Sequence, residues 1–100
     1  MVDSQHEILV NKLGTLLHRA EIRDLLDLEL LLARGGDLPR ALRDAANKDG
    51  GFSPLMVGYL VKSFPLERQA RIAGLDDAAT ASLRAFLADL ARRLAAATPA

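Results

Sequence analysis

The chain has 100 residues, of which 50% are hydrophobic and 4% aromatic, and its formal net charge is zero. This balance excludes a strongly basic nucleic-acid surface over the whole chain, and the absence of cysteine excludes disulfides, thiolate metal sites and a cysteine nucleophile. The sequence shows neither a secretory leader pattern nor an apolar run near the ~20 residues that cross a bilayer. We therefore expect a soluble cytoplasmic protein with no membrane partner.

The distribution of apolar residues predicts an all-α fold, a bundle of five or six helices that forms a single helical domain over residues 1–100. Leucine and alanine dominate the composition, and both favour helix over strand. Capping residues and Gly or Pro breakers place the helix boundaries. In chain order, the predicted helices begin near Ser4, Ile22, Asp37, Ser53, Leu66 and Asp76; the last helix covers residues 76–97, and residues 98–100 form a frayed tail.

The stretch Ile22–Ala33 (IRDLLDLELLLA) is the predicted centre of the bundle, because it is apolar on nearly every side. Its exception is an arc of three charged residues, Arg23, Asp24 and Asp27. Arg23 and Asp27 are four residues apart and can pair with each other. Charges beside a core need partners, because unpaired buried charge is costly. The sequence therefore predicts a polar site on this helix.

Asp24 and Asp27 are three residues apart, so their carboxylates face the same way on a helix. At this spacing they could hold a divalent ion whose shell is completed by water and phosphate. They could equally form interhelical salt bridges to Lys12, Arg19 or Arg40, and spacing alone favours this structural reading. The apolar surroundings of the arc favour a functional site, because perturbed charges in clefts are site candidates. Both readings stay open at this stage.

The fourth helix and the turn before it give weaker signals. Lys48-Asp49-Gly50-Gly51 could cradle a phosphate, although a helix-ending turn is the commoner use of such a segment.

His6 and His18 lack metal-ligand spacing, so we predict no metal site. In the helix pair around the turn, the second helix contains only one cationic residue, Lys62, so we expect no direct DNA binding. The apolar surface of the fourth helix is expected to come from Leu55, Met56, Tyr59, Leu60 and Val61.

A longer motif carries a family resemblance. Lys12 is followed by Arg19 and then by Arg-Asp-x-x-Asp-Leu at residues 23–28, with Lys-Asp-Gly-Gly downstream at residues 48–51. This pattern resembles the C-terminal helical half of the nucleotidyltransferase-like abortive-infection toxins of the AbiEii/AbiGii type. The resemblance covers residues 7–66, more than half of the chain.

The resemblance implies a half-site for a nucleotide. In that family an N-terminal α/β domain binds triphosphate and magnesium through Gly-Ser and Asp-x-Asp, and the helical half completes the site. The enzymes transfer a nucleotide to an acceptor such as RNA and often work in toxin–antitoxin pairs. By this resemblance, Lys12, Arg19, Arg23 and Lys48 bind the nucleotide, and Asp24 and Asp27 act as catalytic residues.

This chain departs from the family pattern because it contains neither Gly-Ser nor Asp-x-Asp. Since nucleotidyl transfer depends on metal ions held by such carboxylates, we expect the catalytic domain to be absent from this chain, and the chain alone to be inactive. Mg²⁺ and a nucleoside triphosphate are then expected only when that domain is supplied, and the partner is a catalytic domain or an antitoxin protein. This hypothesis predicts that Lys12, Arg19, Asp24 and Asp27 converge on one exposed cleft.

The alternative is a stand-alone helical interaction module without catalytic activity, a homodimer that covers an apolar surface between its two chains. In that case the same charged residues should be paired with one another.

Overall fold

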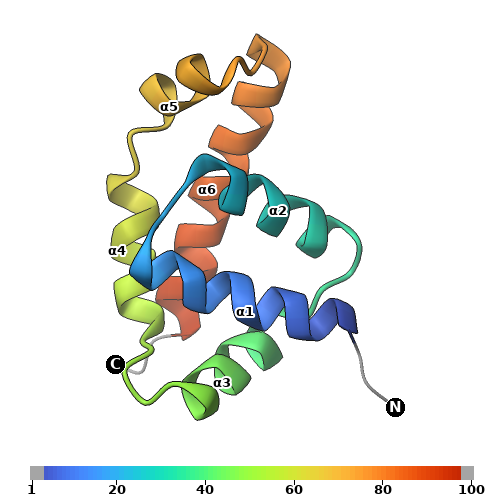
Figure 1. The fold of residues 1–100 in the computed structure, drawn as a ribbon, viewed down its shortest axis with the longest axis vertical. Helices are drawn as coiled ribbons and strands as arrows, with labels where there is room; N and C mark the ends of the chain where they lie inside the picture. The colour runs from blue at the N-terminus through green and yellow to red at the C-terminus, as the bar shows by residue number, and fades with distance from the viewer. Residues whose placement is uncertain (1–3, 98–100) are drawn as a thin grey trace.

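Six α-helices make up the part of the chain that the computed structural model describes, residues 4–97, and this part contains no β-strand (Figure 1). The predicted all-α bundle is therefore confirmed. The predicted tail at residues 98–100 lies outside the described residues. The helices are α1 (Ser4–His18), α2 (Ile22–Ala33), α3 (Leu38–Lys48), α4 (Pro54–Ser63), α5 (Leu66–Ala73) and α6 (Asp77–Ala97).

Aspartates begin two of the helices. The Asp37 Oδ1 atom accepts a hydrogen bond of 3.0 Å from the backbone N–H of Arg40 and so caps α3. Asp76 Oδ1 likewise accepts a bond of 2.7 Å from the N–H of Ala79 in the first turn of α6. Each bond satisfies a helix N–H that has no partner within the helix. Asp76 and its neighbour Asp77 could both cap the last helix, and this hydrogen bond assigns the cap to Asp76.

Glycines end α2 and α5. Gly35 has a φ of 95° and Gly74 a φ of 77°, a left-handed conformation that costs a glycine little. Gly36 follows in a crowded position, where a β-carbon would lie 2.9 Å from the carbonyl oxygen of Leu31 and 3.1 Å from Leu9 Cδ2. The Gly-Gly pair thus lets the chain reverse tightly between α2 and α3.

The long helix α6 lies behind the others in the view of Figure 1, and α4 packs along it. Helix α1 crosses in front and contacts α2, α3 and α4, while α2 also contacts α5 and α6. The core between the helices is mainly leucine, with Leu13, Leu28 and Leu83 fully buried. This arrangement brings the C-terminal half of α1 beside the first turns of α2, where the charged residues lie.

The apolar face of α4 differs in part from the expected one. Val61 is buried as predicted, but Leu55, Met56 and Tyr59 are 63%, 55% and 70% exposed. Buried in their place is Val57, on the side of the helix that packs on α6. Because α4 is apolar on almost all sides, the sequence could not indicate which side faces the core.

Candidate functional site

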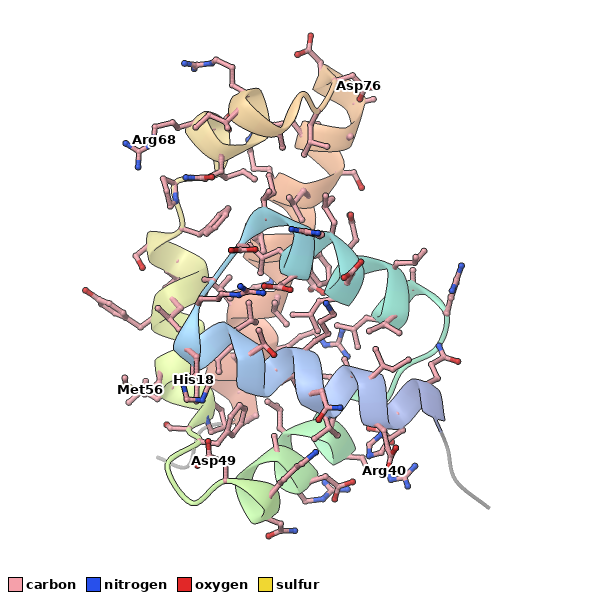
Figure 2. The ribbon with its side chains drawn as sticks, viewed as in Figure 1. His18, Arg40, Asp49, Met56, Arg68 and Asp76 are labelled. Carbon is pink, nitrogen blue, oxygen red and sulfur yellow. The ribbon has the colours of Figure 1, made fainter. Side chains whose placement is uncertain are left out.

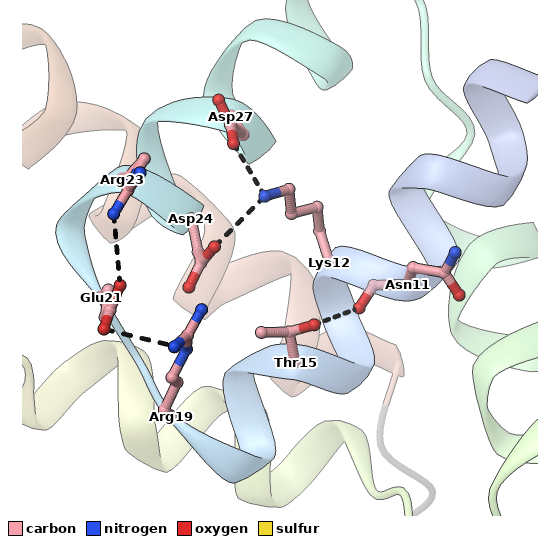
Figure 3. Close-up of polar contacts among 8 residues, drawn as sticks. All are labelled: Asn11, Lys12, Thr15, Arg19, Glu21, Arg23, Asp24 and Asp27. Carbon is pink, nitrogen blue, oxygen red and sulfur yellow. Dashed lines mark hydrogen bonds and ion pairs between the residues drawn. The ribbon is translucent and has the colours of Figure 1, made fainter.

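Lys12 on α1 lies between two carboxylates of α2 (Figure 3). Its Nζ atom is 2.8 Å from Asp27 Oδ2 and 3.2 Å from Asp24 Oδ1. The two aspartates are one helical turn apart, so one ammonium group can reach both of them. Three of the residues predicted for the site are thus brought together across the α1–α2 interface.

The three side chains differ in their access to solvent. Asp24 is 5% exposed as a residue, whereas the side chains of Lys12 and Asp27 are 27% and 43% exposed. The second oxygen of Asp24, Oδ2, is buried and has no hydrogen-bond partner. A buried carboxylate oxygen without a donor is uncommon, because it has lost its hydration and received nothing in exchange. The group is therefore open to solvent on the Asp27 side and incompletely satisfied on the Asp24 side.

The electrostatic surroundings favour the charged form of Lys12. The hydrogen bond to Asp27, followed by the one to Asp24, raises the pKa of Lys12 above its ordinary value of 10.5, against the opposing effect of desolvation. The ammonium is thus positively charged at neutral pH and stays so well into the alkaline range. A permanent cation between two carboxylates leaves the trio with a formal charge of about −1 when both aspartates are ionised.

Arg19 and Arg23 lie at the edge of this group and share another carboxylate, that of Glu21 (Figure 3). Arg19 Nε is 3.8 Å from Glu21 Oε1, and Arg23 Nη2 is 4.0 Å from Glu21 Oε2. Both guanidinium groups are exposed, and such long, exposed ion pairs contribute little to stability. Arg23 takes Glu21 as its ion-pair partner, whereas the sequence suggested Asp27. Sequence reasoning missed Glu21, although it lies between the two arginines in the α1–α2 connection.

Lys48, the last residue of α3, lies apart from the Lys12 group and contacts α1 at another point. Its Nζ atom donates a hydrogen bond of 2.8 Å to Asn11 Oδ1, and Asn11 points away from the Lys12 group in Figure 3. The following Asp49 uses Oδ1 to accept the N–H of Gly51 at 2.9 Å, as in an ordinary helix-ending turn. The nucleotide-binding role of Lys48 stays a prediction, because its contact with Asn11 does not place it in the Lys12 group.

A second polar contact, which the sequence did not indicate, joins α1 to α3. His6 Nε2 lies 2.6 Å from Asp44 Oδ2, and this hydrogen bond lowers the pKa of Asp44 below its ordinary value of 3.8. The two residues are 38 positions apart, so no local pattern could have paired them. The contact joins α1, which carries Lys12, to α3, and it is separate from the Lys12 group between α1 and α2.

The carboxylates of α2 do not form a metal site by themselves, because the Lys12 ammonium occupies the position between them. Within residues 4–97, no group of three or more His, Asp or Glu side chains is arranged to hold a metal ion. In the same part of the chain, no helix combines the length and the apolar character needed to cross a bilayer. A metal ion at this site would need ligands that the described residues do not provide.

The arrangement meets part of each prediction made from the sequence. Of the four residues predicted to converge, Lys12, Asp24 and Asp27 do so in a group that is partly open to solvent, whereas Arg19 pairs with Glu21 beside them. The three converging residues are also paired with one another, as an interaction module without chemistry would have them. The orphan oxygen of Asp24 is the feature that mutual pairing leaves unexplained.

Comparison with known proteins identifies the family. The family model described as "Nucleotidyl transferase AbiEii toxin, Type IV TA system" matches residues 1–98, nearly the whole chain. No curated protein and no solved structure gives a match. The motif formed by Lys12, Asp24 and Asp27 and the extent of this match lead to one conclusion: the chain belongs to the AbiEii family of nucleotidyltransferase-type toxins from toxin–antitoxin systems.

Proposed function

We propose that this protein supplies the helical half of a nucleotide site, and that a catalytic domain absent from this chain supplies the other half. Family membership supports a role in a nucleotidyltransferase-type toxin. The sequence contains no Gly-Ser and no Asp-x-Asp, so the metal-binding carboxylates of the reaction have to come from another polypeptide segment. The chain alone is then without transfer activity.

The observation that carries this proposal is the state of Asp24. A carboxylate retained for stability would have both oxygens satisfied, because a buried acceptor without a donor costs about 1–3 kcal/mol. Asp24 instead has one oxygen on Lys12 and one, Oδ2, that is buried and accepts no hydrogen bond from the protein. In this proposal the side chain turns toward the open Asp27 side when a ligand binds, and Oδ2 then accepts a hydrogen bond from a group such as the hydroxyl of an acceptor nucleotide. The cost in the free protein is then offset when the ligand binds.

Lys12 has a matching role in this proposal. Its ammonium is charged and 27% exposed, and it is held by Asp27 on the more open side. A triphosphate carries more negative charge than one carboxylate, so it would draw the ammonium from Asp27 while Asp24 still holds it in place. Arg19 and Arg23, held only loosely by Glu21, would neutralise the remaining charge. Ligands on the catalytic domain would hold Mg²⁺, and the bound ion would polarise the reacting phosphate.

A reconstitution assay tests the proposal. The full chain is mixed with the separately expressed nucleotidyltransferase domain of an AbiEii-type toxin, and transfer from α-labelled nucleoside triphosphates to RNA is measured with Mg²⁺. We expect no transfer by the chain alone, transfer by the mixture, and a loss of at least about 100-fold with Asp24→Asn, as for removal of one preorganised catalytic group. The matched control is Asp77→Asn, an exposed aspartate in the first turn of α6.

Two results of this assay contradict the proposal. Transfer by the chain alone would show that the site is complete without a second domain. Transfer by the mixture at an equal rate with wild-type and Asp24→Asn protein would remove Asp24 from the site.

The second candidate is a helical interaction module without catalytic activity, and the mutual pairing of Lys12 with Asp24 and Asp27 favours it. In that case the three charges only join α1 to α2. A homodimer would appear in analytical ultracentrifugation as a concentration-dependent mass of two chains. Replacement of both Asp24 and Asp27, the carboxylates that pair with Lys12, would then change stability and leave nucleotide binding unaltered.

A further inference from the structure

A groove lies between α4 and α6, apart from the charged group on α1 and α2. It has a volume of about 140 Å³ and is lined by Leu55, Gly58, Tyr59 and Lys62 of α4 and, on α6, by residues that include Ala91 and Ala95. Its buried floor consists of two small residues, Gly58 and Ala91, together with the leucine side chain of Leu94. Small side chains between two packed helices leave a channel that runs along both of them.

Helix α4 exposes large apolar side chains at and beside the groove. Leu55 and Tyr59 line the groove, and with Met56, which does not, they account for three of the six large hydrophobic side chains that are exposed in the described part of the chain. Met56 points away from the body of the molecule in Figure 2. Scattered exposed hydrophobics are ordinary, but three within five residues beside a groove form a contiguous patch of the kind that binds partners.

The shape of this surface fits a helix. The lining residues on α4 recur at spacings of three and four, from Leu55 through Gly58 and Tyr59 to Lys62. An amphipathic helix lays an apolar ridge with the same spacing into such a groove. The exposed ring of Tyr59 and the side chain of Leu55 stand beside the floor, where they would flank that ridge.

The charge around the groove distinguishes between occupants. Among residues 4–97, Lys62 is the only charged residue that lines it, and α4 contains no carboxylate. A second copy packed symmetrically would present the same patch, so each Lys62 would meet no acidic residue from that patch. A partner that places a carboxylate beside its apolar ridge would pair with Lys62.

We propose that the groove between α4 and α6 binds an acidic amphipathic helix of a partner protein. The apolar ridge of that helix packs over Gly58 and Ala91, and an acidic residue at its edge pairs with Lys62. This surface is built from residues that the nucleotide half-site does not use, so the two proposals can fail separately.

The test uses two synthetic helical peptides of about 18 residues, long enough to form an isolated helix. Both carry leucine at i, i+4 and i+7; one has glutamate beside the leucines and the other has lysine there. Each is titrated into the ¹⁵N-labelled full chain, and amide shifts are followed by NMR. We expect saturable shifts centred on Gly58, Tyr59 and Ala95 with the glutamate peptide and at least about threefold weaker binding of the lysine peptide.

Two variants sharpen the test. Lys62→Glu alters an exposed side chain and should reverse the preference, so that the lysine peptide binds more tightly. Gly58→Ala adds a methyl group at the groove floor, 3.7 Å from Leu94 Cβ, which is an ordinary contact that the fold tolerates. Gly58→Ala should weaken binding of the glutamate peptide, while the thermal unfolding midpoint of the variant stays equal to that of the wild type or rises.

Three outcomes would overturn the proposal. Shifts absent from α4 and α6 with both peptides would mean that the groove binds no helix. Equal affinities for the two peptides, or no reversal with Lys62→Glu, would mean that charge does not select the partner. Self-association of the free chain with shifts at Tyr59 would mean that a second copy covers the groove.

Discussion

Lys12 Nζ lies 3.2 Å from Asp24 Oδ1, and this contact gives the nearly buried Asp24 the only charged partner that it has among the described residues. The same ammonium also binds Asp27, which is 43% exposed at its side chain. Loss of one partner of a buried ion pair is expensive because it strands a charge, whereas an exposed pair contributes little. The three members of the group should therefore differ strongly in their effect on stability.

Lys12→Met should lower the free energy of unfolding by about 2–3 kcal/mol, because it leaves Asp24 buried without a countercharge. Asp27→Asn should cost less than about 1 kcal/mol, since Asp27 is partly solvated and Lys12 keeps Asp24. Urea denaturation at neutral pH measures both changes. Lys62→Met serves as the control for loss of an exposed lysine, with a change below about 0.5 kcal/mol. An equal loss in the free energy of unfolding for Lys12→Met and Asp27→Asn would contradict the view that buried Asp24 depends on Lys12 for its countercharge.

Asp24→Leu should leave stability within about 1 kcal/mol of the wild type or raise it, because an apolar side chain removes the orphan oxygen from the core. In the background of Lys12→Met, the same substitution should recover most of the lost stability, since no stranded charge remains. A double-mutant cycle by urea denaturation tests both statements. A large loss with Asp24→Leu alone would mean that Asp24 is retained for the fold.

The sequence predicted most of the fold because its boundary signals are local. Asp37, Gly35 and Gly74 act within one or two residues of a helix end, and α2 begins and ends at the expected residues. Spacing and charge indicated Lys12 as one of three possible partners of the α2 carboxylates, beside Arg19 and Arg40, and the structure selects Lys12. The packed face of α4 did not, because its residues are apolar on both sides and only contact with α6 selects Val57 over Tyr59.

The polar partners that depend on tertiary structure could not be predicted in the same way. His6 and Asp44 meet only because α1 packs on α3. The pair of Arg23 with Glu21 differs, because these residues are two positions apart and the local sequence could have indicated it. The unpaired oxygen of Asp24, in contrast, is a property of three-dimensional burial. Sequence spacing indicated which carboxylates face the same way but not which of their atoms would be left without donors.

The His6–Asp44 contact should make stability depend on acid. Its hydrogen bond lowers the pKa of Asp44 below 3.8, with smaller effects from Arg40 and Arg43. A carboxyl group whose pKa is lower in the folded state than in the unfolded state stabilises the fold at pH values above the unfolded-state pKa. This contribution is lost as the pH falls through the folded-state pKa. Thermal midpoints between about pH 2 and pH 6 should therefore fall less steeply for Asp44→Asn than for the wild type. Asp77→Asn is the control, and an identical slope for Asp44→Asn and the wild type would count against the contact.

Two glycines should respond oppositely to alanine. Gly58→Ala should raise the free energy of unfolding by about 0.5–1 kcal/mol, because alanine favours helix and its methyl group meets Leu94 Cβ at an ordinary 3.7 Å. Gly36→Ala should lower it by more than about 1 kcal/mol, because the new β-carbon would lie 2.9 Å from the backbone oxygen of Leu31. Urea denaturation compares the pair, and a gain in stability with Gly36→Ala would show that the α2–α3 reversal is looser than described.

The most direct test of the nucleotide half-site observes the Lys12 ammonium itself. The chain contains three lysines, Lys12, Lys48 and Lys62, so their side-chain ¹⁵N signals can be assigned by Lys→Arg substitution. The separately expressed nucleotidyltransferase domain of an AbiEii-type toxin is added, and each nucleoside triphosphate is titrated in with Mg²⁺ while the three signals are recorded. We expect a saturable shift of Lys12 with at least one triphosphate, lost in Asp24→Asn, and no comparable shift of Lys62. A Lys12 signal that stays still, or three lysines that shift equally, would contradict the nucleotide half-site.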